Sequence, residues 1–190
     1  YVYSGLSGKD NLEQSVYIYD GLPYVLVEST LASNSGTTSA VEICPIVSRT
    51  STTLSLPTSN NRIYDMPFAN DNWATYSTTP WSVSQPLTSC EATALFNVTN
   101  RNGLIVGSVD HSTWKSAVVV TPQGTNRVRN IKVQAGYISK RTWDVVDNKA
   151  TSTRHGEVKG ARVNSPKFML GWFEDWRTGM ETVSYTHLRA

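Results

Sequence analysis

The chain has 190 residues, a length that supports one well-packed core and favours a single domain. Charged residues make up only 17% of the sequence and the net charge is +2, with no basic stripe and no recognisable nucleic-acid motif, so we expect no nucleic-acid partner. No apolar run approaches the roughly 20 residues that a spanning helix needs, so we expect no membrane span.

The two cysteines, Cys44 and Cys90, are too few for a structural zinc site, and we expect neither a metal nor a cofactor. A disulfide between them would close a loop of about 46 residues and would stabilise the fold by about 3–4 kcal/mol. Two buried free thiols are the alternative that the sequence favours.

The first predicted elements are two β-branched runs, residues 15–19 and 23–30, which Asp20-Gly21 joins in a tight hairpin. Both faces of the second run are mostly apolar, which indicates a central strand. Residues 40–44 continue the strand pattern up to Pro45, which lacks an amide hydrogen and indicates a sheet edge.

Residues 48–89 are rich in Ser, Thr, Pro and Asn, and we expect this long stretch to contain hidden short strands and to bind a ligand. Within it, Asp71 and Trp73 combine an acid with an aromatic face, as a sugar-binding surface requires. The alternative is that Trp73 and Trp81 plug the edge of the domain, with their indole N–H groups bonded to loop carbonyls.

Residues 92–98 and 104–109 predict a second hairpin around Asn102-Gly103. Residues 104–109 and 117–120 both read as strands buried on two faces, and residues 110–115 lie between them with an acid, an imidazole, an indole and an amine. We expect this polar segment to hold a bend through side-chain bonds to the backbone. A direct contact of Trp114 with a ligand is the alternative.

Further strands are predicted at residues 127–138, 157–163 and 167–173, and residues 174–183 show the spacing of an amphipathic helix. Eight or nine strands at short spacing predict an all-β fold, a twisted antiparallel β-sandwich with one short C-terminal helix. We place this domain at residues 1–182.

Three segments carry a resemblance to a known family: residues 67–73 (PFANDNW), residues 107–115 (GSVDHSTWK), and Ser165-Pro166 followed by residues 170–181 (LGWFEDWRTGME). Together they resemble the N-terminal β-supersandwich domain of alpha-galactosidase-like glycoside hydrolases, the melibiase group, over about residues 22–181. The chain departs from the family at Ala69 and Ser112, where an acid is common.

The resemblance implies a supersandwich-like domain that precedes a (β/α)₈ barrel, with both catalytic carboxylates on that barrel. No residue of this chain inherits a catalytic role. The expected partners are an alpha-galactoside-like carbohydrate and the missing barrel, the expected sugar contacts are Asp71, Trp73 and Trp114, and the expected location is periplasmic or extracellular. Residues 183–190 resemble translated sequencing adapter at the broken end of a metagenome-derived chain, so we expect them to be non-native.

Three functions follow as hypotheses. The first is a non-catalytic domain of a glycoside hydrolase that flanks a sugar site, the second a free-standing carbohydrate-binding or lectin-like module, and the third an independent enzyme. Asp110 and His111 are neighbours in a strand end and point to opposite faces, which disfavours the enzyme. The apolar stripe of the helix suggests continuation into another domain, which disfavours the free module.

Overall fold

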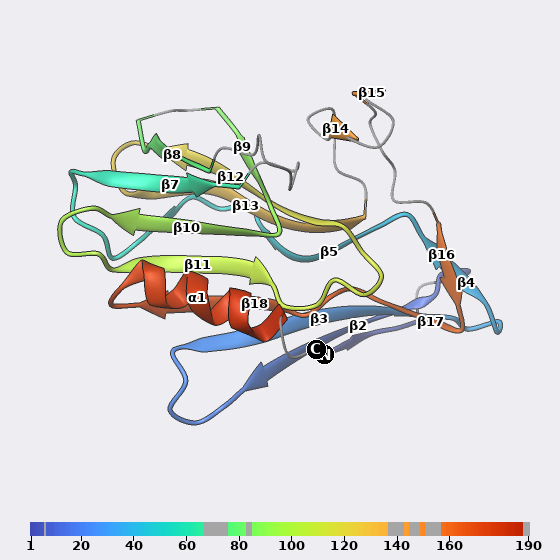
Figure 1. The fold of residues 1–190 in the computed structure, drawn as a ribbon. Helices are drawn as coiled ribbons and strands as arrows, with labels where there is room; N and C mark the ends of the chain where they lie inside the picture. The colour runs from blue at the N-terminus through green and yellow to red at the C-terminus, as the bar shows by residue number, and fades with distance from the viewer. Residues whose placement is uncertain are drawn as a thin grey trace.

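The computed structural model describes residues 1–5, 7–66, 76–82, 85–136, 143–144, 149–150 and 157–187. Strands make up 56% of the described residues and lie in antiparallel sheets, with one short helix near the C-terminus (Figure 1). This arrangement confirms the predicted all-β sandwich-like fold.

Nine strands form the larger sheet, in the order β1-β2-β3-β18-β11-β10-β7-β8, with β17 paired to β3. Their bounds are β1 Val2–Tyr3, β2 Asn11–Ile18, β3 Tyr24–Ala32, β7 Asn61–Asp65, β8 Ser77–Pro80, β10 Ala92–Asn97, β11 Gly103–Ser108, β17 Arg162–Asn164 and β18 Phe168–Phe173.

The smaller, five-stranded sheet has the order β5-β13-β12-β9, with β6 paired to β13, and two further strand pairs are β16-β4 and β14-β15. The bounds are β4 Thr38–Ala40, β5 Glu42–Ser48, β6 Thr52–Thr53, β9 Leu87–Cys90, β12 Ser116–Gln123, β13 Arg127–Gly136, β14 Trp143–Asp144, β15 Lys149–Ala150 and β16 Val158–Gly160. The helix α1 spans Trp176–His187.

The two sheets pack face to face over one apolar core. Leu95, Val106 and Phe168 of the larger sheet lie in the same buried cluster as Val118 and Val133 of the smaller one. All five side chains are at most 3% exposed, so the sandwich interior excludes water where the sheets overlap.

Helix α1 covers the other face of the larger sheet, along β10, β11 and β18 (Figure 1). A methyl group added at Gly107 would approach Cγ1 of Val183 to 3.0 Å, and one added at Gly179 would approach Cγ1 of Ile105 to 2.4 Å. The helix therefore contacts β11 closely at Gly107 of the strand and at Gly179 of the helix. Among the described residues, no helix has the length and apolarity to cross a membrane.

Several local predictions are confirmed. β2 and β3 form the expected hairpin, Gly21 adopts a positive φ of 73° in its turn, and β3 is a central strand. β10 and β11 form the second hairpin. Pro45 lies in β5, an edge strand of the smaller sheet, and the stretch of residues 48–89 contains the short strands β6 to β9.

Two boundaries differ from the prediction. The run 157–163 divides at Ala161, because β16 pairs with β4 while β17 joins the larger sheet at β3. The helix begins two residues later than predicted, since Asp175 precedes it and accepts the amide hydrogen of Arg177 at 3.0 Å, the geometry of an N-cap. It also continues past Val183, whose side chain is buried against the sheet.

Both cysteines are free thiols, as the sequence favoured. Cys44 on β5 and Cys90 on β9 lie on opposite edges of the smaller sheet, with β13 and β12 between them. Three strand spacings amount to about 14 Å, whereas bridged cysteines have Cα atoms less than about 7 Å apart. Burial is the main cause that raises the pKa of each thiol to about 12.

The close contact between α1 and the sheet at Gly179 predicts that Gly179→Ala destabilises the protein. Helix propensity alone favours Ala by about 1 kcal/mol, but the added methyl group would collide with Ile105 and Phe173. We expect a net loss of about 1–3 kcal/mol in the free energy of unfolding, measured by urea denaturation. Thr178→Ala, at an exposed neighbouring position of the helix, is the matched control and should change stability by less than about 0.5 kcal/mol. Equal effects of the two substitutions on stability would contradict a close contact between α1 and the sheet at Gly179.

The raised thiol pKa values predict slow alkylation of the folded chain. A thiol with an ordinary pKa near 9 reacts readily at pH 9, whereas Cys44 and Cys90 should reach half-maximal rates only near pH 12. Because protonated thiols are favoured in the folded state, their contribution to stability is complete below about pH 9 and is lost as the pH rises toward 12. Mass spectrometry after iodoacetamide treatment measures the alkylation rate of each thiol, with urea-unfolded protein as the control. Fast labelling of the native protein at pH 9 would contradict the predicted slow alkylation.

Candidate functional site

Two of the stretches that carry the family resemblance, residues 107–115 and Ser165-Pro166, lie next to each other at one end of the sandwich. The amide of Val109 donates to the carbonyl of Lys167 at 2.9 Å, and the indole Nε1 of Trp114 donates to the carbonyl of Asn164 at 2.7 Å. Met66, directly before the segment 67–73, accepts a hydrogen bond from the amide of Cys90 at 2.9 Å. We call this region, formed by residues 65–66, 89–91, 108–116 and 164–167, the motif end.

The chain crosses between the two sheets twice at the motif end. Glu91 connects β9 of the smaller sheet to β10 of the larger one, and residues 109–115 connect β11 back to β12. The Glu91 amide donates to the carbonyl of Ser116 at 3.0 Å, and its carbonyl accepts from the amide of Ser108 at 2.8 Å. Glu91 has a φ of 60°, a left-handed conformation that a non-glycine residue adopts only where its surroundings enforce it.

Charged side chains gather on this double crossing. Nδ1 of His111 lies 3.9 Å from Oε1 of Glu91, and both side chains are partly exposed. Oδ1 of Asp110 accepts the amide hydrogen of Ser112 at 2.9 Å, and this bond is the main cause that lowers the pKa of the Asp110 carboxyl. The motif end therefore offers hydrogen-bond donors and acceptors next to one another, as recognition of a hydroxylated ligand requires.

Trp114 is 3% exposed and packs into the core between the sheets. Its indole N–H is bonded to a backbone carbonyl, so in this structure the ring presents no open face for a sugar to stack on. The side-chain bonds of Asp110 and Trp114 to the backbone agree with the expected role of residues 110–115 in holding a bend. Trp81 is likewise buried, with its Nε1 3.0 Å from the carbonyl of Arg127.

Asp71 and Trp73, the other two expected sugar contacts, lie outside the described residues. The structure does define both ends of their segment. Met66 donates its amide hydrogen to Oγ of Ser89 at 2.8 Å, and the ring of Tyr76 stacks on Tyr64 at a centroid distance of 6.2 Å. Met66, the residue before this segment, therefore belongs to the motif end.

A cavity of about 550 Å³ lies at the opposite end of the sandwich, which we call the cavity end. Ser59, Asn60, Arg62 and Thr125 are among the residues that line it. Beneath it, Nδ2 of Asn61 donates to the carbonyls of Pro57 and Thr125 and fixes two separate turns. Sequence reasoning missed this site, because its residues come from four turns far apart in the chain.

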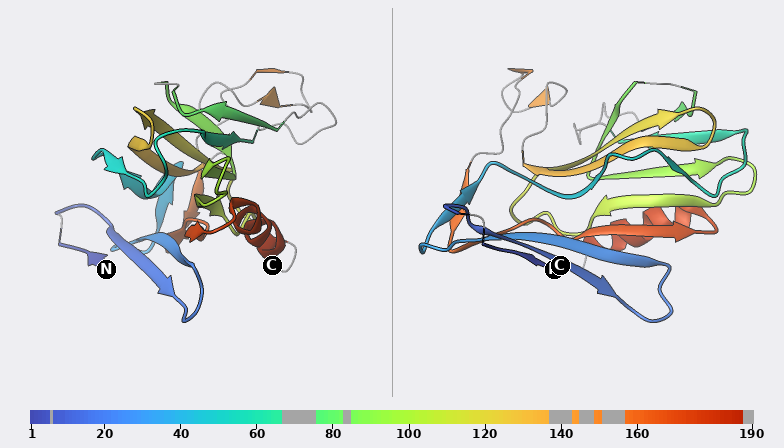
Figure 2. Two further views of the ribbon diagram at one scale, coloured as in Figure 1. Left: turned by 90° about the vertical axis from the view of Figure 1, so that its left-hand side faces the viewer. Right: turned by 180° about the vertical axis from the view of Figure 1, so that it is seen from behind.

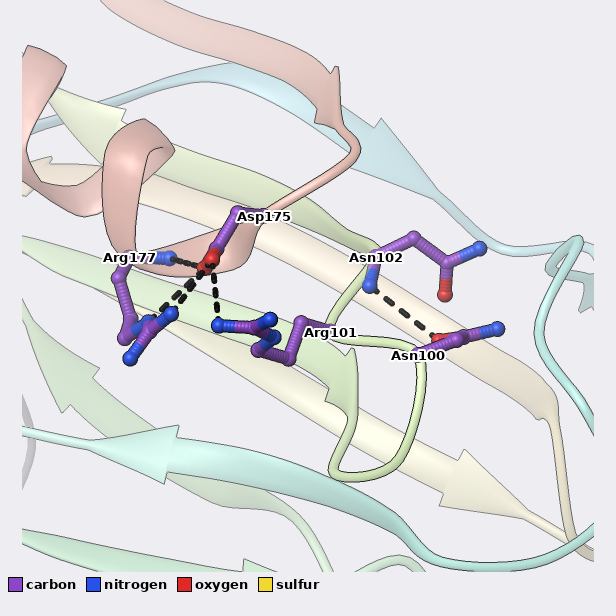
Figure 3. Close-up of polar contacts among 5 residues, drawn as sticks. All are labelled: Asn100, Arg101, Asn102, Asp175 and Arg177. Atoms are coloured by element: carbon purple, nitrogen blue, oxygen red, sulfur yellow. Dashed lines mark hydrogen bonds and ion pairs between the residues drawn. The ribbon is translucent and has the colours of Figure 1, made fainter.

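Charged residues around the start of α1 have a structural role. Asp175 accepts two hydrogen bonds from the Arg177 guanidinium and lies 3.5 Å from Nη1 of Arg101, as Figure 3 shows. The hydrogen bonds from Arg177 are the main cause that lowers the pKa of Asp175 to about 2. The carbonyl of Arg101 also accepts the amide hydrogen of Trp176 at 2.8 Å, so this turn caps the helix.

The described carboxyl groups do not resemble a catalytic pair. A general acid needs a raised pKa, whereas the pKa values of six described carboxyl groups are lowered; these are Asp10, Glu13, Glu42, Asp110, Glu157 and Asp175. In the same ranges, no group of three or more His, Cys, Asp and Glu side chains is arranged to hold a metal ion.

Comparison with known proteins adds no relative. No protein-family model, no curated protein and no solved structure matches this chain.

The Asp110–Ser112 bond predicts a pH-dependent contribution to stability. Because the folded pKa of Asp110 is lowered, its contribution is present above about pH 4 and is lost as the pH falls through the folded pKa. Asp110→Ala should lower the free energy of unfolding at pH 7 by about 0.5–1.5 kcal/mol. Asp110→Asn keeps an acceptor oxygen, so it should lose less at pH 7 and unfold with a weaker pH dependence between pH 3 and 5. Urea denaturation across this range measures both, and an unchanged pH dependence in both variants would contradict the assignment.

Proposed function

We propose that this chain is a non-catalytic β-sandwich domain of a carbohydrate-active, alpha-galactosidase-like glycoside hydrolase. In this proposal the motif end flanks the sugar site of a (β/α)₈ barrel that follows α1. The main support is that two family-like stretches far apart in the sequence, residues 107–115 and Ser165-Pro166, lie next to each other at the motif end.

The direction of α1 also supports this proposal. The helix begins beside Arg101, at the cavity end, and runs along β11 until Val183 contacts Gly107 next to the motif end. A domain that followed α1 would therefore start close to the loops of the motif end. Such a position would let Glu91, Asp110 and His111 form one wall of a site whose other walls belong to the barrel.

The lowered carboxyl pKa values favour a role in binding sugar over a role in acid catalysis for these groups. Retaining hydrolysis requires one carboxylate as nucleophile and a second carboxyl with a raised pKa as acid, about 5–5.5 Å apart. The Asp110 carboxylate already accepts a backbone amide, and its lowered pKa keeps it ionised at neutral pH. It is suited to accept hydrogen bonds from sugar hydroxyl groups.

A free-standing carbohydrate-binding module is the alternative, and the cavity end favours it. The cavity of about 550 Å³ is large enough for a small saccharide, and hydroxyl, amide and guanidinium groups line it. In this alternative the cavity end, and not the motif end, would bind the sugar.

The proposed function predicts weak binding without turnover. The 190-residue chain should not hydrolyse a chromogenic alpha-galactoside, and it should bind methyl alpha-galactoside with a dissociation constant on the order of 1 mM or weaker. Trp73→Ala should weaken this binding at least about fivefold if its ring stacks on the sugar. Calorimetric titration measures the affinity, and Trp81→Phe, at a buried ring of the cavity end, is the control. Turnover that Asp71→Asn removes would overturn the proposal and make the chain an enzyme.

A further inference from the structure

Strand β2 turns its apolar face toward solvent. Leu12, Val16 and Ile18 alternate along the strand and are 42%, 44% and 77% exposed. An alternating strand normally buries its apolar face and exposes its polar one. In β2 the polar side chains Glu13 and Tyr17 form bonds within the chain, while the three apolar side chains remain exposed.

The polar face of β2 is well satisfied. Glu13 forms a bidentate ion pair with the guanidinium of Arg162, and the hydroxyl of Tyr17 donates to Oε2 of Glu28 at 2.9 Å. The ammonium group of Lys167 lies over the Tyr17 ring, 5.5 Å from its centroid. The polar side chains on this side of the hairpin therefore need no partner from another molecule.

The apolar face continues the core of the sandwich. Val16 lies opposite Val27 of β3, and Val27 lies opposite Phe168 of β18, which is fully buried between the sheets. Side chains at directly opposite positions of an antiparallel sheet share a face. Val16 and Ile18 therefore belong to the inner face of the larger sheet, beyond the point where the smaller sheet stops covering it.

The smaller sheet reaches this face at one end only. Nε2 of Gln14 donates to the carbonyl of Pro45 at 2.8 Å, and a groove of about 450 Å³ lies between β5 and the strands β1 to β3. Toward the hairpin turn the strands β2 and β3 extend away from the rest of the molecule (Figure 2). Tyr3 of β1, opposite Leu12 and 56% exposed, widens the same face.

We propose that a second copy of this chain covers this face, which we define as Tyr3, Leu12, Val16, Ile18 and their β3 neighbours Val25 and Leu31. The two copies form a two-fold dimer in which the inner faces of the hairpins pack against each other. Aligned sheets pack about 10 Å apart at about 30°. The dimer would thus extend to β2 the double-layered packing that the sandwich core already has.

Charge supports a second copy as the occupant. A two-fold axis places each patch against itself, so any charge on the patch would face a like charge. On the described strands β1 to β3, the inner face carries no charged side chain; its polar members are Gln14, which is bonded to Pro45, and Ser29, which is buried. The small net charge of +2 adds little repulsion between copies.

The area of the face fits a weak dimer. At about 200 Å² per large side chain, the exposed fractions of Tyr3, Leu12, Val16 and Ile18 leave on the order of 400 Å² of exposed side-chain surface, a large patch within the range found on monomers. A standard interface buries about 800 Å² per partner. We therefore expect a dissociation constant in the micromolar range. The proposal does not depend on the proposed function.

Sedimentation velocity of the 190-residue chain, from about 1 to 100 μM, tests the dimer. The unaltered chain should shift from monomer to dimer across this range. Val16→Lys combined with Ile18→Lys should weaken the dimer at least about tenfold, because it would bring four unpaired positive charges into one apolar interface. Ser15→Lys is the matched control, since this exposed position lies on the other face, opposite Glu28, and should leave the dimer unchanged.

Both Lys positions are already exposed, so we expect folded variants, which circular dichroism and thermal melting would verify. If the Lys variant unfolds, Val16→Thr combined with Ile18→Thr keeps the β-branched shape and should weaken the dimer in the same direction. A chain that stays monomeric at the highest concentration would overturn the proposal. So would a dimer that survives the folded double variants or that Ser15→Lys disrupts equally.

Discussion

The double crossing at the motif end is the constraint on which the rest of the structure depends. Glu91 carries the chain from the smaller sheet to the larger one, residues 109–115 carry it back, and the backbone of Glu91 bonds to both Ser108 and Ser116. These bonds hold the ends of β10, β11 and β12 together. Because Trp114 then fills the core beneath the crossing, the two sheets cannot slide past each other without exposing it.

The crossing and the helix together give the sandwich two different ends. Gly107 of β11 and Gly179 of α1 have no side chains to hold the two elements apart, so α1 lies close along β11 and ends beside the crossing. The motif end thus combines charged loops with the end of the helix, while the cavity end combines tight turns with a cavity of about 550 Å³. This asymmetry is why we assign the functional role to the motif end.

Much of the local structure was predictable from sequence. The hairpin of β2 and β3 follows from a period of two around Asp20-Gly21, and the helix follows from a period near 3.6 after Trp172. The sequence also predicted strands on both sides of residues 110–115. It did not reveal that these strands belong to different sheets, because strands buried on both faces look alike wherever they pair.

The site was less predictable, for two physical reasons. An aromatic ring beside polar residues has the same sequence pattern whether it stacks on a sugar or fills a core, and only packing decided that Trp114 is buried. The cavity is formed by turns that no sequence spacing relates, and it was not foreseen. The exposed face of β2 was hidden for a similar reason, since its alternation is that of an ordinary strand and only the extent of the smaller sheet leaves it uncovered.

The most direct test of the account is to map where a sugar binds. Titration of the ¹⁵N-labelled chain with methyl alpha-galactoside, followed by amide chemical shifts, compares the two ends in one experiment. The account predicts that the shifts concentrate at Glu91, Asp110 and His111. Shifts confined to Ser59, Arg62 and Gly124 at the cavity end, or no shifts at all, would contradict it.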